Sequence, residues 1–413
     1  MVAGRVTDSE RGAPMPSQHP RQRVIALFTA VVAAALLSAC SVSDAETTGL
    51  VAATTDAASD TTASAAPPKL SVTDGATDVE PGVGVKVTSK SEMQTVTLTD
   101  AQGNDVDGEF NSDETEWENT EDLNYGTQYT LTARVAGGKK TEATFTTAYA
   151  GAQTNVGIGP LADSTVGVAQ AITFSFGYPI KDTKAAEQAI TVETSNDTEG
   201  GFFWLSPQEL RWRPKEFWEA GTEVTVKADL FGRNLGGNVW GATDMEHSFT
   251  IGEHIEAVVD NKDKKMRVYN DGELVREFPV SLGRDNQFDT PNGTYVVGDA
   301  HESLVMDSRS YGLGINEGGY VTPVDYATQL SYSGIYVHSA PWALDALGKR
   351  NQSHGCVNAT PEDARWFQQY VHRGDPVIIK NTGGQTLTPY DGLGYWNLDW
   401  ETRSGGSKEP MYE

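Results

Sequence analysis

The sequence is short of cysteine and of positive charge. It holds two cysteines, Cys40 and Cys356, in 413 residues, so at most one disulfide can form and each thiol needs its own explanation. Lys and Arg number 31 against 57 Asp and Glu, which gives a net charge of −26. Such a chain has too few basic residues to neutralise phosphates, so binding to nucleic acid and adhesion of the protein surface to an anionic membrane are both disfavoured.

Long apolar runs are also scarce, and the clearest one lies near the N-terminus. Residues 24–39 are sixteen apolar or small residues without a charge, and four arginines precede them. The run is shorter than the about 20 residues of a spanning helix, so residues 1–39 are predicted to be a secretory signal peptide. Leu37-Ser38-Ala39-Cys40 resembles the bacterial lipobox. We therefore expect diacylation of Cys40, a plain signal peptide or an uncleaved anchor with an incidental cysteine being the alternatives.

A polar region follows the apolar run, and two stretches of predicted short strands come after it. Residues 40–68 are rich in Ser, Thr, Ala and Asp and lack aromatics, which predicts a disordered tether. Alternating apolar residues and turn signals predict an immunoglobulin-like β-sandwich over 69–150 and another over 151–252. A tandem repeat is also indicated, because residues 126–133 are echoed by 221–228 and residues 144–147 by 248–251.

Tryptophan is concentrated in the second of these stretches. Such residues in a predicted sandwich favour packing in a core or at a domain interface over stacking on a ligand. The tryptophans concerned are Trp204, Trp212, Trp218 and Trp240.

A third region, residues 253–380, has a different texture. The sequence Asn270-Asp271-Gly272-Glu273 predicts a hairpin turn between two strands. The Gly-rich and aromatic segment 299–334 is predicted to be a long functional loop. One helix is clear: Thr360 is its expected N-cap, and Gly374 its expected end.

The C-terminal extension, residues 381–413, carries two further tryptophans. Trp396 and Trp400 are expected to fold back on a neighbouring domain.

The chemistry is expected at Cys356. If Cys40 carries lipid, Cys356 is the one remaining thiol of an exported chain, and such a thiol is a candidate nucleophile. His338, separated from Cys356 by seventeen residues, and His354 are the imidazoles that could take its proton. Gly355 lets the backbone approach a substrate and direct N–H groups at an oxyanion. An inert buried cysteine is the alternative, and metal binding by these side chains lacks a fourth ligand; no metal or other cofactor is expected.

These residues carry a family resemblance. A histidine separated by seventeen residues from the cysteine of Ser353-His354-Gly355-Cys356-Val357-Asn358 resembles the signature of the bacterial L,D-transpeptidase catalytic domain. The lipobox, two modules and tryptophan-bearing tail resemble the actinobacterial members. The expected fold is mainly β: two immunoglobulin-like β-sandwich domains, a β-rich catalytic domain with one clear helix, and a C-terminal tail. The resemblance implies an acyltransferase on the outer face of the cytoplasmic membrane, lipid-anchored and extending into the cell wall.

The reaction implied by the resemblance is cross-linking of peptidoglycan. Cys356 would attack the third residue of a tetrapeptide stem, expel D-Ala and form a thioester, which the side-chain amine of an acceptor stem would resolve as a 3→3 cross-link. An L,D-carboxypeptidase of the same fold, in which water resolves the thioester, is one alternative. A catalytically silent cell-wall-binding lipoprotein is another, from a different class.

The resemblance also implies roles for single residues. His338 would be the base and later the acid, with its other ring nitrogen held by the backbone carbonyl of Ser339. Backbone N–H groups of Gly355 and Cys356 would form the oxyanion hole with the Tyr320 hydroxyl. Carbapenem β-lactams would acylate the same cysteine. Substrate contacts would come from Met306, Tyr311, Tyr320, Ser333, Gly334, Trp342, His354 and Asn358.

Overall fold

The computed structural model describes residues 66–136, 138 and 140–401, which belong to one compact unit. The predicted signal peptide, Cys40 and nearly all of the predicted tether lie outside the described residues. Within the described ranges, no helix is both long and apolar enough to cross a membrane.

The first sandwich consists of two sheets that enclose one core. Along one of its strands every second side chain is buried, from Tyr129 to Val135, as the alternating sequence predicts. These side chains meet Val87 and Trp117 of the opposite sheet. The sheets run β1 (Lys69–Leu70), β3 (Lys86–Thr88), β7 (Glu116–Asn119), β6 (Gly108–Phe110), and β2 (Ala76–Val79), β9 (Thr141–Thr147), β8 (Gln128–Val135), β4 (Met93–Asp100), β5 (Asp105–Val106).

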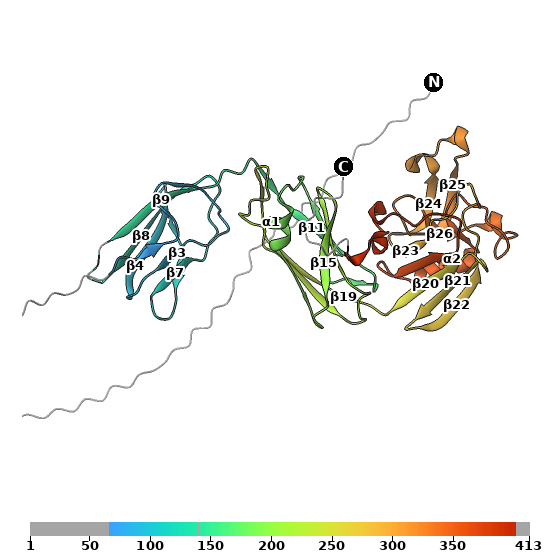
Figure 1. Cartoon of the computed structure of the whole chain (residues 1–413), viewed down its shortest axis with the longest axis horizontal. Helices are drawn as coiled ribbons and strands as arrows, with labels where there is room; N and C mark the ends of the chain where they lie inside the picture. Colours follow the sequence, from blue (N-terminus) through green and yellow to red (C-terminus); the bar gives the residue numbers. More distant parts are fainter. Residues whose placement is uncertain (1–65, 137, 139, 402–413) are drawn as a thin grey trace, which may run out of the picture. The chain divides into compact units, whose positions relative to one another are not determined.

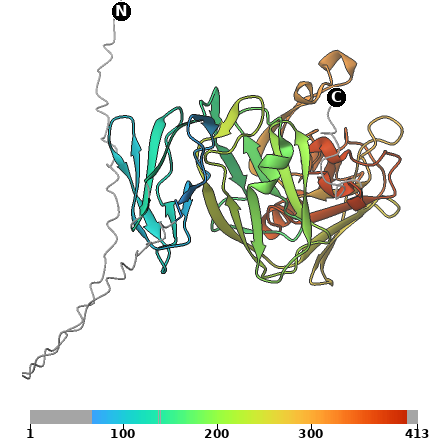
Figure 2. The ribbon, with the colours of Figure 1, turned by 60° about the vertical axis from the view of Figure 1, so that its left-hand side comes forward.

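The second sandwich has the same two-layer construction (Figure 2). It also contains a short helix, α1 (Thr183–Gln188), which was not predicted and which Asp182 caps at its N-terminus. Its sheets run β11 (Val156–Gly159), β13 (Ile172–Phe176), β16 (Glu209–Pro214), β15 (Gly200–Ser206), and β12 (Thr165–Val166), β19 (Met245–Ile251), β17 (Glu223–Ala228), β14 (Ile190–Thr194), with β10 (Ala152–Thr154) paired to β18 (Val239–Gly241).

The echoed segments, from which a repeat is predicted, can be compared by strand register. In the first sandwich Tyr129 lies opposite Phe145, and β2 runs parallel to β9. In the second, Val224 lies opposite Phe249, and β12 runs parallel to β19. Both pairs come from the echoed segments, so equivalent residues occupy equivalent places.

The four tryptophans of the second sandwich pack, as predicted, in the protein interior. Trp204, Trp212 and Trp218 belong to its core. The indole N–H of Trp218 donates to the carbonyl of Gln170 at 2.7 Å, which satisfies the polar atom of a buried ring. Trp240 is buried too, and its ring makes a T-shaped contact with that of Tyr125.

The predicted catalytic region, residues 253–380, contains two sheets and one α-helix, α2 (Pro361–Tyr370). Ala364 and Phe367 of α2 enter a core to which both sheets contribute. The sheets run β22 (Glu273–Pro279), β21 (Lys265–Asn270), β20 (Ile255–Asp260), β28 (Pro376–Lys380), β23 (Gly293–Val296), and β24 (Ala300–Asp307), β25 (Val321–Gln329), β26 (Tyr336–Ser339), β27 (Val357–Ala359).

The predicted boundaries of α2 are half right. The hydroxyl of Thr360 accepts the N–H of Asp363 at 3.0 Å, so the N-cap is confirmed. The helix ends at Tyr370 instead of continuing towards Gly374, because Val371 adopts extended backbone and places its side chain in the core. Gly374, with φ of 95°, forms the turn that follows.

The prediction of a long loop over 299–334 is wrong. Most of this segment is the antiparallel hairpin of β24 and β25, and the short helices η1 (Ser308–Tyr311) and η2 (Ile315–Glu317) form its tip. The glycines that suggested a loop are concentrated in the tip, where Gly312 and Gly318 have positive φ. The hairpin (orange) projects from the rest of the catalytic region in Figures 1 and 2.

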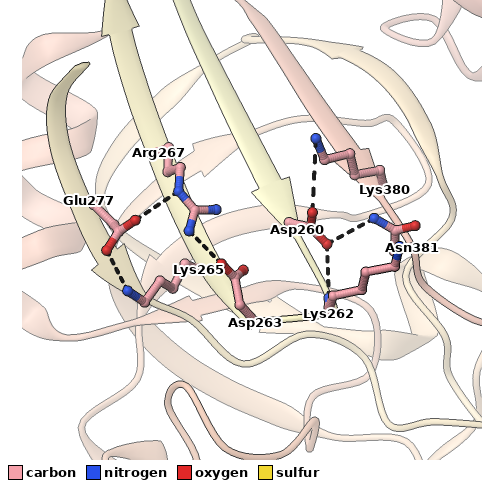
Figure 3. A network of polar contacts seen from close by, with 8 residues as sticks. All are labelled: Asp260, Lys262, Asp263, Lys265, Arg267, Glu277, Lys380 and Asn381. Atoms are coloured by element: carbon pink, nitrogen blue, oxygen red, sulfur yellow. Dashed lines mark hydrogen bonds and ion pairs between the residues drawn. The ribbon is translucent and has the colours of Figure 1, made fainter.

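The outer face of the five-stranded sheet carries charge. The Asp271-Gly272 turn between β21 and β22 is confirmed, with both residues at positive φ. Alternation along β21 buries Met266 and Val268 and leaves Lys265 and Arg267 on the other face. These two bases pair with Glu277 (Figure 3). Exposed pairs of this kind contribute little stability.

The described part of the C-terminal extension folds back as predicted. The indole N–H of Trp396 donates to the carbonyl of Ala169 in the second sandwich at 2.8 Å, and the Arg213 guanidinium lies over the Trp396 ring and near that of Trp400. The extension also contacts the catalytic region, through η4 (Pro389–Asp391) and η5 (Tyr395–Asn397); Asn397 bonds both backbone groups of Thr294.

Candidate active site

A pocket of about 410 Å³ opens over the four-stranded sheet of the catalytic region. Seven of the predicted site residues lie in its wall, together with four that were not predicted. The wall consists of Met306, Tyr320, Thr322, Val324, His338, Trp342, Gln352, Ser353, His354, Cys356 and Asn358.

Strand pairing brings the thiol and the imidazole to one face of this sheet. β26 and β27 are adjacent and parallel, with Val337 opposite Val357 and His338 opposite Asn358. Because side chains alternate along a strand, the two valines enter the core and His338 and Asn358 point to the other face. Cys356 lies two residues before Asn358 and shares that face. The seventeen-residue segment between His338 and Cys356 therefore returns the cysteine beside the histidine.

The loop before the cysteine is held by two hydroxyl groups. The hydroxyl of Thr290 donates to the carbonyl of Gly355 at 2.7 Å and accepts the N–H of Gly283 at 2.9 Å. The hydroxyl of Ser353 accepts the N–H of Gly355 at 3.1 Å and donates to the carbonyl of Cys356 at 2.7 Å. The N–H of Gly355, which the resemblance assigns to an oxyanion hole, is thus already engaged.

Gly355 is required by the shape of this loop. Its φ is 128°, and a Cβ at this position would lie 2.7 Å from the side chain of Ile335. Any other residue would be strained in this backbone conformation and would also clash.

Cys356 carries a neutral thiol in this environment. Its side chain is buried, and burial raises the pKa of the thiol to about 11. The Sγ lies 3.4 Å from the carbonyl oxygen of Gly334, to which the S–H donates. The thiol is therefore protonated at pH 7 and needs a base before it can act as a nucleophile.

His338 has the properties of such a base. Its Nδ1 lies 2.8 Å from the carbonyl oxygen of Ser339, and since a carbonyl can only accept, Nδ1 carries the proton. Burial keeps the pKa of His338 below its ordinary value, so the ring is neutral at pH 7. Its Nε2 is left with a free lone pair, which is the requirement for accepting the proton of Cys356.

His354 is engaged elsewhere. Its Nε2 lies 3.0 Å from the carbonyl oxygen of Gly318 at the hairpin tip. Its ring contacts Tyr320, with centroids 4.9 Å apart, and Phe288, with centroids 4.4 Å apart. His354 therefore connects the loop that carries the nucleophile to the tip of the hairpin.

Five of the predicted residues do not line the pocket, and one of them is Gly355, described above. Ser339 contributes its backbone carbonyl to His338, and Gly334 contributes its carbonyl to Cys356. The Tyr311 ring packs where a Cβ of Gly334 would be, and its hydroxyl lies 3.4 Å from that of Tyr336. The backbone N–H of Ser333 donates to Asp391. Their assigned roles stay predictions.

Sequence reasoning missed several residues that shape the site. Thr290 is the first residue of a Thr-Pro-Asn-Gly-Thr-Tyr turn, and this turn motif was a signal in the sequence that could have pointed to it. Phe288 and Asp391 offered none, because their contacts with His354 and with the 331–334 loop are made across long stretches of chain.

The described residues include no group of three or more His, Cys, Asp or Glu side chains placed to hold a metal ion. The chemistry described above depends on the thiol, the imidazole and backbone groups.

Comparison with known proteins gives matches along most of the chain. A bacterial Ig domain family matches residues 76–234, and the L,D-transpeptidase catalytic domain family matches residues 255–379. L,D-transpeptidase 2 of Mycobacterium tuberculosis (strain CDC 1551 / Oshkosh) is 42% identical over 349 residues, which cover 83% of this chain and 85% of that protein.

Solved structures match as well. An L,D-transpeptidase, LdtMt1, in complex with imipenem is 32% identical, with 55% of this chain and 99% of that chain covered and a TM-score of 0.49. L,D-transpeptidase 3 from Mycobacterium tuberculosis in complex with a faropenem-derived adduct is 33% identical, with 55% and 98% covered and a TM-score of 0.47.

Proposed function

This chain belongs to the L,D-transpeptidase family, and we propose that it cross-links peptidoglycan through a thioester on Cys356. The observation that carries the proposal is the placement of a thiol and a neutral imidazole with a free Nε2 on one face of one sheet, in one pocket. This pair can generate a thiolate at the moment of attack.

The first half-reaction uses both members of the pair. Nε2 of His338 takes the proton of the thiol as Sγ attacks the carbonyl carbon of the third residue of a tetrapeptide stem. The imidazolium then returns the proton to the amine of the departing D-Ala.

The negative charge on the attacked oxygen needs donors. We assign this role to the backbone N–H of Cys356 and the hydroxyl of Tyr320, whose pKa is raised by burial so that the hydroxyl keeps its proton. The N–H of Gly355 donates to the Ser353 hydroxyl, so we assign it to holding the shape of the loop and not to the oxyanion.

The second half-reaction releases the enzyme. The side-chain amine of an acceptor stem attacks the thioester, His338 takes the proton of the amine, and the thiol is restored with a 3→3 cross-link formed. Water in place of the amine would give L,D-carboxypeptidase activity, which is the second outcome of the test below.

The partners and location follow from the same proposal. Donor and acceptor stem peptides are the substrates, and β-lactams of the carbapenem type acylate Cys356, in line with the imipenem complex of a family member. Lipid on Cys40 anchors the chain at the outer face of the cytoplasmic membrane, so that the catalytic region reaches into the cell wall.

The test is incubation of the purified full-length chain with disaccharide tetrapeptides, followed by mass spectrometry of the products. Dimers that have lost one D-Ala, absent with Cys356→Ala, are expected. Tripeptide monomers without dimers would indicate the carboxypeptidase, and unchanged substrate with folded protein would contradict both.

A further inference from the structure

One carboxylate of the C-terminal extension, that of Asp391, binds the 331–334 loop of the active site. Asp391, at the end of η4, is 8% exposed. Its Oδ1 accepts the backbone N–H of Tyr332 at 2.7 Å, and its Oδ2 accepts the backbone N–H of Ser333 at 2.9 Å. Two charge-assisted bonds from one side chain to successive amides fix both the position and the direction of the loop.

The 331–334 loop contacts the nucleophile. Gly334, which follows Ser333, has φ of 95°, and its carbonyl oxygen lies 3.4 Å from Sγ of Cys356. The far side of the loop is held by the hydroxyl of Ser331, which accepts the N–H of Ile335 at 2.8 Å. Asp391 therefore restrains the side of the loop from which the Gly334 carbonyl projects.

The extension is closely fitted to this loop. A Cβ on Gly392, the residue after Asp391, would lie 2.3 Å from the ring of Tyr332, and Gly392 has φ of 100°. A side chain at this position would overlap the Tyr332 ring, so the backbone of the extension lies close to the loop.

The hydrogen bond from the Cys356 thiol to the Gly334 carbonyl affects the ionisation of the thiol. A thiol that donates to a carbonyl is stabilised in its neutral form, because a thiolate has no proton to donate and would face the carbonyl oxygen. The same bond also directs Sγ towards Gly334. Loss of the bond would therefore ease ionisation of the thiol and at the same time release its direction.

We propose that Asp391 is a positioning residue of the active site, through which the C-terminal extension holds the Gly334 carbonyl against the neutral thiol of Cys356. The extension thus completes the site although it lies after the catalytic motif in sequence. The inference rests on the proposed function for its meaning in catalysis, but the positioning itself can be measured without any substrate.

The test compares two reactions of Cys356 in full-length wild type, Asp391→Asn and Asp391→Ala. One is alkylation by iodoacetamide as a function of pH, which follows ionisation of the thiol. The other is acylation by imipenem, which needs the thiol in its aligned position. Intact-mass spectrometry measures both, and peptide mapping separates Cys356 from Cys40.

The expected result is a split between the two reactions. In Asp391→Ala, iodoacetamide should alkylate Cys356 at least about threefold faster at pH 7, and the midpoint of the pH profile of alkylation should be lowered. Imipenem should acylate Cys356 at least about tenfold more slowly. Asp391→Asn keeps one acceptor and should lie between. Asp260→Asn is the matched control: Asp260 also accepts a backbone N–H, from Lys262 at 2.9 Å, at the end of the central strand β20 and outside the pocket (Figure 3).

Each other outcome is decisive. Unchanged profiles in folded Asp391→Asn and Asp391→Ala, or an equal fall in both rates, would overturn the positioning role. If Asp391→Ala does not fold, the split in Asp391→Asn decides. A wild type that resists imipenem, beside a shifted alkylation profile in the variants, would contradict the proposed function and leave the positioning role standing.

Discussion

The hydroxyl of Thr290 gives the sharpest test of how the nucleophile loop is held. Thr290→Val keeps the shape of the side chain and removes its oxygen. Two buried groups lose their partners: the carbonyl of Gly355 and the N–H of Gly283. A buried polar group without a partner costs about 1–3 kcal/mol, so for two such groups we expect the free energy of unfolding to fall by about 2–6 kcal/mol.

Thr290→Ser is the control for this change. It keeps the oxygen and loses one buried methyl group, which costs about 1 kcal/mol. Urea denaturation of both variants measures the difference, and imipenem acylation shows whether Cys356 is still aligned. Two variants within about 0.5 kcal/mol of each other, the ordinary scatter of neutral substitutions, would refute the claim that this hydroxyl holds the loop.

Three further predictions address other parts of the chain. Asp375 is buried with Oδ1 unpartnered, and burial raises its pKa from 3.8 to about 7. The folded state therefore loses stability as pH rises from about 4 through 7, by at most about 4 kcal/mol, and thermal unfolding of Asp375→Asn should lack this decline; parallel pH profiles would exclude it. Phe288→Ala removes a ring that packs against His354, whose Nε2 contacts the hairpin tip. Reaction of Cys356 with a bulky disulfide reagent should therefore accelerate more than reaction with iodoacetamide. Equal acceleration would argue that the contact of Phe288 with His354 does not restrain the hairpin. Tyr320→Phe should slow imipenem acylation about tenfold with little change in unfolding free energy if its hydroxyl stabilises the oxyanion, and an unchanged acylation rate would remove Tyr320 from that role.

Local patterns in the sequence predict much of the fold, because period-two alternation and turn residues act over a few positions. The strands of both sandwiches, the Asp271-Gly272 turn and the Thr360 cap all depend on neighbours in sequence. The hairpin of β24 and β25 was missed for the same reason. Glycines near its tip dominated the pattern, whereas the pairing of Met306 with Thr322 is decided by tertiary structure.

The site divides in the same way. The spacing of His338 and Cys356 and the residues beside them carry the chemistry, and a motif can carry that much. Ser353 supports the loop from within the motif, but two other supports lie outside it: Thr290 reaches Gly355 across 65 residues, and Asp391 reaches Ser333 across 58. Bonds of this kind depend on how two distant segments pack, which no single stretch of sequence specifies.

The most direct test of the central claim is intact-mass spectrometry of the full-length chain after incubation with imipenem, with wild type beside Cys356→Ala. The account predicts one covalent adduct on the wild type and none on the variant. A folded wild type without an adduct, or an adduct that persists in Cys356→Ala, would contradict the claim that Cys356 is the activated nucleophile of this pocket.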